Sequence, residues 1–425
     1  MVMVRPQVVV VGGGWAGCAA ALAARKVGLD VTLIERTNML LGSGLVGGIF
    51  KNNGRLTALE ELRCMGGGEI IKVMEDCARH TNLSFPGHVH ASLYDVEVIE
   101  ANVRELILNK GIKLLLENRV MDAHIVGRQV VGVGLASGGI IEGEAYVDAT
   151  GTAGPPGNCL RHGAGCVMCI FRCPTFGPRV SLAARAKVQE EIHEQALGMS
   201  GSCELNKHTL ASWLADRLDT SGCVLIPIPK YMVHGEMLGR KACQQYALPE
   251  YADNLVFLDN GRVKLMTPFF PLEELRRLPG MERVTYHDPY GGGRGNSVRF
   301  GLITPRDDAL KVQDLDNLFC AGEKVGLTVG HSEALVTGTL AGYNAARFAL
   351  DLAPLVLSRE LTVGDFITWV REQIGMGEVG TRYTFSGGAY FNRMKETGLY
   401  TTHLGQIEDR IDGLGLTNVF AKPLL

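Results

Sequence analysis

The first forty residues alternate between apolar runs and small-residue segments, a pattern that predicts strands joined by helices. Residues Val8 to Val11 form a continuous β-branched run, which is typical of a strand buried on both faces. An alanine-rich helix is expected from Cys18 to Arg25, and a second apolar run from Val31 to Ile34 ends at Glu35. Strand, helix and strand in this order predict a parallel βαβ unit.

Later patterns predict a larger mixed fold around this unit. Residues 114–133 alternate as a β-meander, and the apolar runs on either side of Asn260-Gly261 predict a hairpin. A small-residue helix is expected over 330–346 and an amphipathic helix over 360–375. The Ala, Glu and Leu content predicts helix over 180–218.

A glycine-rich loop lies between the first strand and the first helix. Its sequence is Gly12-Gly13-Gly14-Trp15-Ala16-Gly17, a GxGxxG pattern. In such a loop the first glycine permits a tight turn, the second lets backbone approach a pyrophosphate, and the third lets helix pack on strand. Glu35 follows Gly14 by 21 residues, close to the spacing of an acid that accepts ribose hydroxyls. The whole unit predicts a dinucleotide site.

Two later strings resemble the remaining cofactor motifs of two-dinucleotide-fold flavoproteins. Residues 145–151, Ala-Tyr-Val-Asp-Ala-Thr-Gly, resemble the motif that returns the chain to the cofactor after a β-meander. Residues 316–323 end in Gly322-Glu323 and resemble the strand whose acid holds the ribityl chain. The helix that opens at Gly330-His331-Ser332 resembles the helix whose N-terminus points at the flavin pyrimidine. The resemblance implies FAD as the cofactor.

Shorter segments are similar to the family of glucose-inhibited division protein A, which includes the folate- and FAD-dependent tRNA uracil methyltransferases. These segments are Leu45–Ile49, Cys64–Ile70, Arg172–Thr175, Leu278–Val284 and Phe319–Arg347. The family resemblance also implies a set of residues that bind FAD: Gly12, Gly14, Trp15, Ala16, Gly17, Glu35, Arg36, Gly48, Val120, Thr150, Gly151, Gly322, Glu323, Gly330, His331 and Ser332. The tRNA-modifying members carry a reactive cysteine soon after the ribose-binding acid, whereas residues 37–62 contain none here.

These features together predict an α/β fold built on a Rossmann-like FAD-binding domain of the GR2 type. This domain has three layers in the order ββα: two β-sheets and one layer of helices. An inserted α+β substrate domain and a helical C-terminal tail complete it. The expected boundaries are 1–152 and 301–349 for the FAD-binding domain, 153–300 for the insertion and 350–425 for the tail. The tail is expected either to cover the active site or to form a dimer contact.

Composition and charge restrict the remaining choices. Glycine makes up 54 of 425 residues, about twice its usual share, as expected of a fold with close backbone approaches. The 42 basic and 45 acidic residues give a net charge of −3, which excludes a globally basic nucleic-acid binder. We expect no membrane association, because no apolar run reaches the roughly 20 residues of a span. We find no export signal and expect a cytoplasmic protein.

Four of the eleven cysteines, Cys159, Cys166, Cys169 and Cys173, fall within fifteen residues. One hypothesis is a reactive thiolate near the flavin, with Cys173 as the favoured residue, activated by Arg161, Arg172 or Arg179. A second is an iron–sulfur cluster, because Cys-x2-Cys-x3-Cys-Pro matches the end of a ferredoxin pattern. The third is a set of buried structural thiols. The favoured hypothesis makes Cys173 catalytic, and the site list contains no metal ligands.

Three other candidates have both functional and structural interpretations. His331 opens the helix that is expected to face the flavin, and it is predicted to be catalytic. The structural interpretation is that a histidine at this position only caps the helix N-terminus. Arg294, in the glycine-rich segment 290–296, could hold an anionic substrate or could belong to a solvent loop. His88 and His90 alternate on an expected strand and could lie on one face as metal ligands.

The favoured function at this stage is an FAD-dependent oxidoreductase whose non-covalently bound flavin exchanges hydride or electrons with a substrate. The expected partner is a small molecule or a redox protein, with NAD(P)H bound transiently over the flavin as one source of reduction. We expect a homo-oligomer and do not expect nucleic acid as a partner. The alternatives are a flavin-dependent RNA-modifying enzyme that transfers a one-carbon unit and a flavoprotein subunit with an iron–sulfur cluster.

Overall fold

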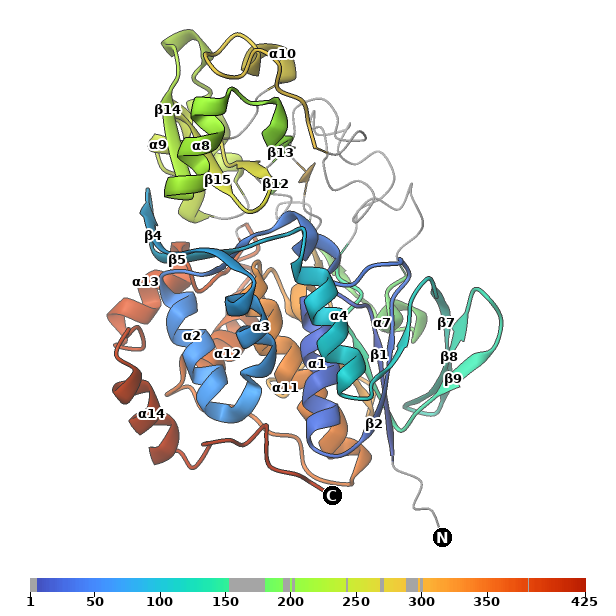
Figure 1. Ribbon diagram of the computed structural model, residues 1–425. Helices are drawn as coiled ribbons and strands as arrows, with labels where there is room; N and C mark the ends of the chain where they lie inside the picture. Colours follow the sequence, from blue (N-terminus) through green and yellow to red (C-terminus); the bar gives the residue numbers. More distant parts are fainter. Residues whose placement is uncertain are drawn as a thin grey trace.

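A five-stranded parallel sheet forms the centre of the molecule (Figure 1). The computed structural model describes residues 6–152, 180–193, 199–200, 203–241, 244–267, 271–287, 297–298, 301–380 and 382–425. The order of the strands is β19 (Leu318–Cys320), β10 (Ala145–Asp148), β1 (Gln7–Val11), β2 (Asp30–Ile34) and β6 (Lys113–Leu115). Residues Val8 to Val11 are buried, as their continuous apolar run predicts.

Helices cover one side of this sheet and a β-meander lies on the other, which confirms the predicted three-layer α/β fold (Figure 1). The helical side contains α1 (Trp15–Lys26), α4 (Ile99–Asn109) and α11 (His331–Ala349). The meander consists of β7 (Val120–Val126), β8 (Gln129–Leu135) and β9 (Ile140–Glu142), paired antiparallel.

A second sheet lies above the parallel sheet and leads to the inserted region. It has the order β3 (Ile49–Lys51), β5 (His88–Tyr94) and β4 (Ala78–Phe85). The inserted region contains a four-stranded antiparallel sheet of β13 (Cys203–Leu205), β16 (Val263–Leu265), β15 (Asn254–Asp259) and β14 (Cys223–Pro227).

Strand β15 explains how the inserted sheet is attached. Leu255 and Phe257 pack into the core of the inserted region, whereas Val256 and Leu258 pack with Leu93 of β5. Because neighbouring side chains of a strand point to opposite faces, one apolar strand joins two cores. The inserted sheet therefore rests directly on the β3–β5–β4 sheet.

The remaining elements are short or lie at the edges. The helices are α2 (Gly54–Leu62), α3 (Glu69–Asp76), α7 (Leu182–Arg185), α8 (Ser212–Ser221), α9 (Glu250–Asp253), α10 (Leu272–Leu275), α12 (Thr362–Gly375), α13 (Gly388–Glu396) and α14 (Leu404–Gly413). Two short antiparallel pairs join β11 (Glu191–Ile192) to β18 (Leu302–Ile303), and β12 (Met199–Ser200) to β17 (Ser297–Val298). In the described ranges, no helix is both long enough and apolar enough to cross a bilayer.

Most of the element predictions agree with the structure, and one is wrong. The hairpin around Asn260-Gly261 and the helices at 331–349 and 362–375 are present. The meander is also present but spans 120–142, because Leu114 and Leu115 belong to β6 of the parallel sheet. The helical prediction for 180–218 fails, because its described part contains only α7 and the start of α8 as α-helices, and it also contains β11, β12 and β13. Those strands pair with residues 263–265, 297–298 and 302–303, so their partners are remote in sequence and local composition does not reveal them. The exact domain boundaries stay a prediction.

Helices α1 and α11 approach closely because two glycines of α11 face α1. A Cβ atom added at Gly338 would lie 2.2 Å from the carbonyl oxygen of Ala16. At Gly342 it would lie 2.1 Å from the carbonyl oxygen of Ala20. Both distances are far below van der Waals contact, so no larger residue fits without moving the helices apart.

We predict that Gly342→Ala destabilises the protein by about 1–3 kcal/mol, because the methyl group overpacks the α1–α11 contact. The matched control is Gly405→Ala in α14, where an added Cβ meets no atom within 4 Å. That control should leave stability unchanged or raise it by up to about 1 kcal/mol through helix propensity. Urea unfolding of both variants measures the difference, and equal midpoints would disprove the steric explanation.

Candidate functional site

A long cavity runs from the ends of β1, β2 and β10 to the inserted sheet. Its empty volume is about 1710 Å³ when the space at its open mouth is included. We call the part near the glycine loop the nucleotide end; Gly12, Gly14, Glu35, Arg36, Arg119 and Val120 line it. We call the opposite part the insertion end; Gly47, Ile49, Gln245, Tyr246, Lys264, Met266 and His331 line it.

The glycines of the loop have different physical roles. Gly12 has φ +102°, and a Cβ there would lie 2.4 Å from the carbonyl oxygen of Ala149. A Cβ at Gly17 would lie 1.8 Å from the carbonyl oxygen of Gly12. Gly14, in contrast, lines the cavity, and its Cβ would meet nothing within 4 Å. Gly12 and Gly17 thus serve the fold, whereas Gly14 keeps space open before the N-terminus of α1, where an anion is stabilised.

The carboxylate of Glu35 is held in place at the nucleotide end. Its Oε2 accepts a hydrogen bond from the backbone N–H of Gly13 at 2.7 Å, and its Oε1 accepts from the N–H of Thr37 at 2.9 Å. The Thr37 hydroxyl also donates to Oε1 at 3.0 Å. Each carboxylate oxygen accepts more than one hydrogen bond, so Oε2 keeps capacity for a ribose hydroxyl. Burial lowers the pKa of the neighbouring Arg36, and Arg119 lowers it further, so an anion beside them would be stabilised.

The middle of the cavity is formed where β10 and β19 end. Asp148 fixes the turn after β10, because its Oδ1 accepts from the Thr150 N–H at 3.1 Å and from the Thr150 hydroxyl at 2.7 Å. Glu323 lines the cavity, and its Oε2 accepts from the Thr152 hydroxyl at 2.8 Å. Two segments that are distant in sequence therefore meet beside the cavity.

The N-terminus of α11 lies at the insertion end. Tyr94 donates its hydroxyl hydrogen to the carbonyl oxygen of Gly44 at 2.6 Å, and its oxygen is 3.3 Å from His331 Nδ1. Because the tyrosine hydrogen is already used, His331 Nδ1 is the donor in this contact. Ser332 donates to the carbonyl oxygen of Phe50 at 2.5 Å and is fully buried.

The structure brings most of the predicted cofactor residues together. Those that line the cavity are Gly12, Gly14, Trp15, Ala16, Glu35, Arg36, Val120, Thr150, Gly151, Gly322, Glu323, Gly330 and His331. Gly17, Gly48 and Ser332 do not line it and contact protein instead. Cys173, the other cluster cysteines with their three arginines, and the segment 290–296 lie outside the described residues.

Sequence reasoning missed several side chains of the insertion end, among them Lys264. Its Nζ donates to the carbonyl oxygens of Val46 at 2.5 Å and Gly47 at 2.9 Å, and the side chain is buried. A lysine inside the apolar strand Val263–Leu265 is the only local signal of this role. Gln245 and Tyr246 have no such signal, because no periodic pattern surrounds them.

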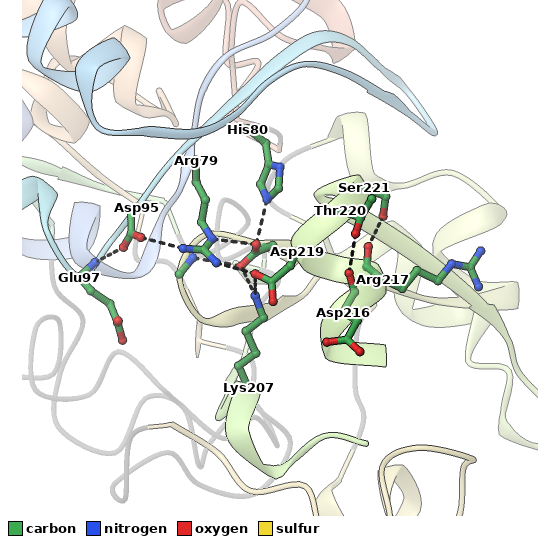
Figure 2. A network of polar contacts seen from close by, with 12 residues as sticks. Arg79, His80, Asp95, Glu97, Lys207, Asp216, Arg217, Asp219, Thr220 and Ser221 are labelled. Atoms are coloured by element: carbon green, nitrogen blue, oxygen red, sulfur yellow. Dashed lines mark hydrogen bonds and ion pairs between the residues drawn. The ribbon is translucent and has the colours of Figure 1, made fainter. Parts of the chain in front are cut away.

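A cluster of charged side chains lies at the end of β15, next to the turn at Asn260; Figure 2 shows Arg79, His80, Lys207 and Asp219 of this cluster. The buried carboxylate of Asp259 accepts hydrogen bonds from Arg79 at 2.7 Å and Lys207 at 3.2 Å, and it lies 2.8 Å from His80. Burial alone would raise the pKa of Asp259, but these hydrogen bonds and charges lower it to about 2. The next residue, Asn260, donates to the carbonyl oxygen of Gly47 at 3.0 Å. The cluster therefore fixes the turn that holds the loop at Gly47.

The C-terminal tail reaches the cavity wall. Arg55 lines the cavity, and its Nε lies 3.1 Å from Oε1 of the buried Glu333 in the first turn of α11. Glu333 also accepts from the Thr384 hydroxyl at 2.6 Å and from the Phe385 N–H at 2.8 Å. Of the two expectations for the tail, the structure thus supports a place beside the site.

Neither the described cysteines nor the paired histidines form a reactive cluster. No described cysteine lines the cavity, and burial raises the pKa of the Cys64 thiol. His88 Nδ1 lies 2.9 Å from the carbonyl oxygen of Pro86, whereas His90 Nδ1 lies 3.1 Å from Asn82. The two histidines thus have separate partners, and in the part of the chain that the structure describes no three His, Cys, Asp or Glu residues could share a metal ion.

The three-layer fold and this cavity define a flavoprotein, and FAD is its cofactor. The open space before Gly14, the acid at Glu35 and the cavity length fit the phosphates, ribose and extended shape of FAD. A profile of the family described as glucose inhibited division protein A matches residues 7–207 and 261–353. The chain belongs to this family.

Similar proteins agree with this assignment. The chain is 25% identical to the tRNA uridine 5-carboxymethylaminomethyl modification enzyme MnmG of Thermus thermophilus over 83% of this chain and 66% of that protein. It is also 25% identical to the MnmG of Syntrophotalea carbinolica, over 83% of this chain and 64% of that protein. The chain thus spans slightly less than two thirds of these relatives' length. The fold matches Aquifex aeolicus GidA with a TM-score of 0.71 and 18% identity, over 99% of this chain and 74% of that one.

We predict that Gly14→Ala weakens FAD binding at least tenfold without destabilising the protein, because its methyl group enters only the space before α1. Gly12→Ala is the contrasting variant, since its methyl group collides with Ala149 and requires φ +102°; it should lower the melting temperature. Flavin fluorescence titration and thermal unfolding of both apoproteins measure the two effects. Equal loss of stability in both variants would refute the separate roles.

We predict a loss of stability in acid from His88, which stacks between Phe85 and Tyr246. Burial lowers the pKa of His88 to about 4, below an unfolded value of about 6.5. The contribution is complete above pH 6.5 and is lost as pH falls from 6.5 to 4, by about 3 kcal/mol in total. The test measures the unfolding free energies of wild type and His88→Phe across this pH range. The slope of the free energy against pH should be smaller in the variant by the contribution of one proton. Parallel pH profiles would contradict this assignment.

Proposed function

We propose that this chain is an FAD-dependent enzyme that modifies a uridine base of tRNA. The observation that carries the proposal is the similarity to tRNA uridine modification enzymes over 83% of this chain, which includes the cofactor cavity. The sequence alone favours an oxidoreductase without a nucleic-acid partner, whereas the relatives favour the RNA-modifying alternative. A net charge of −3 describes the whole chain and does not exclude a local surface that binds RNA.

FAD supplies the hydride and electron transfer. The residues of this chain bind the cofactor, orient it toward the substrate and tune its electronic properties. The glycine loop and Glu35 hold the nucleotide half, as the geometry of Gly14 and the Glu35 hydrogen bonds supports. At the insertion end, the N-terminus of α11 and the ammonium group of Lys264 favour negative charge on a bound ring. His331 is placed to donate or accept a proton there.

The base must leave its stack to reach a flavin inside the cavity. Enzymes that act on a nucleobase read the extruded base through stacking and through hydrogen bonds to its edge. The insertion end supplies an aromatic ring, an amide and an ammonium group, which are the side chains that such recognition uses. This chemistry supports a base as the substrate.

A second candidate is an oxidoreductase for a small molecule. It is favoured by the lining of the cavity, which contains no cysteine among the described residues. The tRNA-modifying members to which the sequence is similar carry a reactive cysteine. Cys173 as a catalytic thiol stays a prediction, and Cys173→Ser tests it.

We predict that the FAD-loaded protein, supplied with NADH and a folate one-carbon donor, converts uridine in an unmodified tRNA transcript to a nucleoside of altered mass. Lys264→Met should slow this conversion at least tenfold, because it removes both a buried positive charge at the insertion end and the two hydrogen bonds that hold Val46 and Gly47. The control is Lys72→Met, an exposed lysine of α3 paired with Asp76, which should not change the rate. Mass spectrometry of digested tRNA gives the readout. NADH oxidation without any change in tRNA would favour the oxidoreductase.

A further inference from the structure

Tyr94 and His331 form a pair of rings at the N-terminus of α11. His331 is the first residue of α11 and lines the cavity, whereas Tyr94 of β5 is fully buried. The Tyr94 oxygen lies 3.3 Å from His331 Nδ1. The ring of Trp15 packs beside both, with its centroid 5.6 Å from that of Tyr94 and 6.2 Å from that of His331. One nitrogen of a cavity-lining imidazole is therefore held against a fixed protein group.

The direction of the hydrogen bond between the two rings follows from the other contact of Tyr94. Its oxygen lies 2.6 Å from the carbonyl oxygen of Gly44. Two oxygens this close need a hydrogen between them, and only the hydroxyl can supply it. Burial raises the pKa of Tyr94, so the hydroxyl keeps this hydrogen at neutral pH. The contact with His331 is then a hydrogen bond only if Nδ1 is the donor.

This arrangement determines which tautomer His331 adopts. A neutral imidazole has one N–H group, so hydrogen on Nδ1 leaves Nε2 as the nitrogen that can take up a proton. The edge of the ring that carries Nε2 lies against Gly47, where an added Cβ would be 2.4 Å from Nε2 and 1.9 Å from Cε1. Gly47 lines the insertion end together with His331. The absence of a side chain at Gly47 thus makes room for this edge of the ring.

The charges around His331 favour its neutral form while the ring of FAD is uncharged. Besides Tyr94, the charged side chains near this end among the described residues are Lys264 of β16, Arg55 of α2 paired with Glu333 of α11 at 3.1 Å, and Glu204 of β13 paired with Arg262 at 2.8 Å. The two ion pairs each sum to zero charge. The Lys264 ammonium group and the N-terminus of α11 remain, and both disfavour a second cation.

We propose that Tyr94 is a positioning residue for His331, and that His331 takes up one proton at Nε2 when the bound FAD is reduced. A hydride donor of the reduced nicotinamide class delivers two electrons and one hydrogen to FAD, which then carries one negative charge. That charge favours the imidazolium form of His331, and the added proton comes from solvent. Reoxidation of FAD releases this proton again. The proposal depends on FAD and does not depend on tRNA as the substrate.

The first test counts protons from the pH dependence of the flavin midpoint potential, measured by spectroelectrochemical titration of the FAD-loaded protein from about pH 5 to about pH 9. Over part of this range wild type should take up one proton more per two electrons than His331→Asn, whose amide cannot be protonated. His331→Gln is a second variant, in case asparagine impairs folding. The proposal is overturned if wild type and these variants take up the same number of protons throughout.

Tyr94→Phe separates positioning from packing, because it removes only the hydroxyl group. The imidazolium form then lacks an acceptor at Nδ1, so the pH range of the extra proton should move about one unit lower. Tyr390→Phe is the matched control, since the buried Tyr390 hydroxyl donates to a backbone carbonyl, that of Thr362, at 2.7 Å. It should behave as wild type. An unchanged pH range in Tyr94→Phe would show that Tyr94 does not act through His331.

The tautomer is measured directly by ¹⁵N NMR of protein labelled at histidine, with FAD oxidised and His331→Asn used for assignment. Wild type should carry the hydrogen on Nδ1, and Tyr94→Phe should move it at least partly to Nε2. Hydrogen on Nε2 in wild type would contradict the proposal. Neither measurement uses tRNA, so a negative result here is distinguishable from a failure of the proposed function.

Discussion

The hydrogen bonds from the Lys264 ammonium group to two successive carbonyl oxygens hold the cavity together. They fix Val46 and Gly47 against the inserted sheet, and Asn260 adds a third bond to the same loop. On its other side Gly47 faces α11, since a Cβ there would lie 1.9 Å from His331 Cε1. The inserted sheet, the loop and the flavin-facing helix therefore meet at one peptide. Any displacement of the inserted sheet would move the wall opposite His331.

A second buried lysine joins segments that are distant in sequence. Lys324 is fully buried between Asp148 of β10 and Glu190, with contacts of 3.2 and 2.5 Å. Burial lowers the pKa of Lys324, but the two carboxylates raise it overall, so the ammonium form is retained. Buried ion groups of this kind add little net stability compared with apolar residues. Their value here is geometric, because each group accepts only one arrangement of its partners.

How much of the fold the sequence predicts depends on the range of the interactions. The glycine loop, Glu35 and the hairpin at Asn260-Gly261 are determined by neighbours in sequence, and their structures agree with the prediction. The strands between 191 and 205 pair with residues from 263 to 303, so composition could not reveal them. Lys264 could be suspected as a charge inside an apolar strand. Gln245 could not, because its role comes from Ser386, which is 141 residues away.

The site also consists of one part built from local motifs and one part built from residues that are distant in sequence. The half that binds the nucleotide consists of local motifs, which is why a family profile detects it and why different activities can share it. The insertion end combines Gln245 of the insertion, Ser386 of the tail and Glu333 of α11, which are connected through Thr384. No single segment of the chain therefore forms this end of the cavity. Thr384 shows how closely the segments are joined, because its hydroxyl donates to Glu333 and accepts from Arg55 and from the N–H of Ser386, so one side chain of the tail connects α2 with α11.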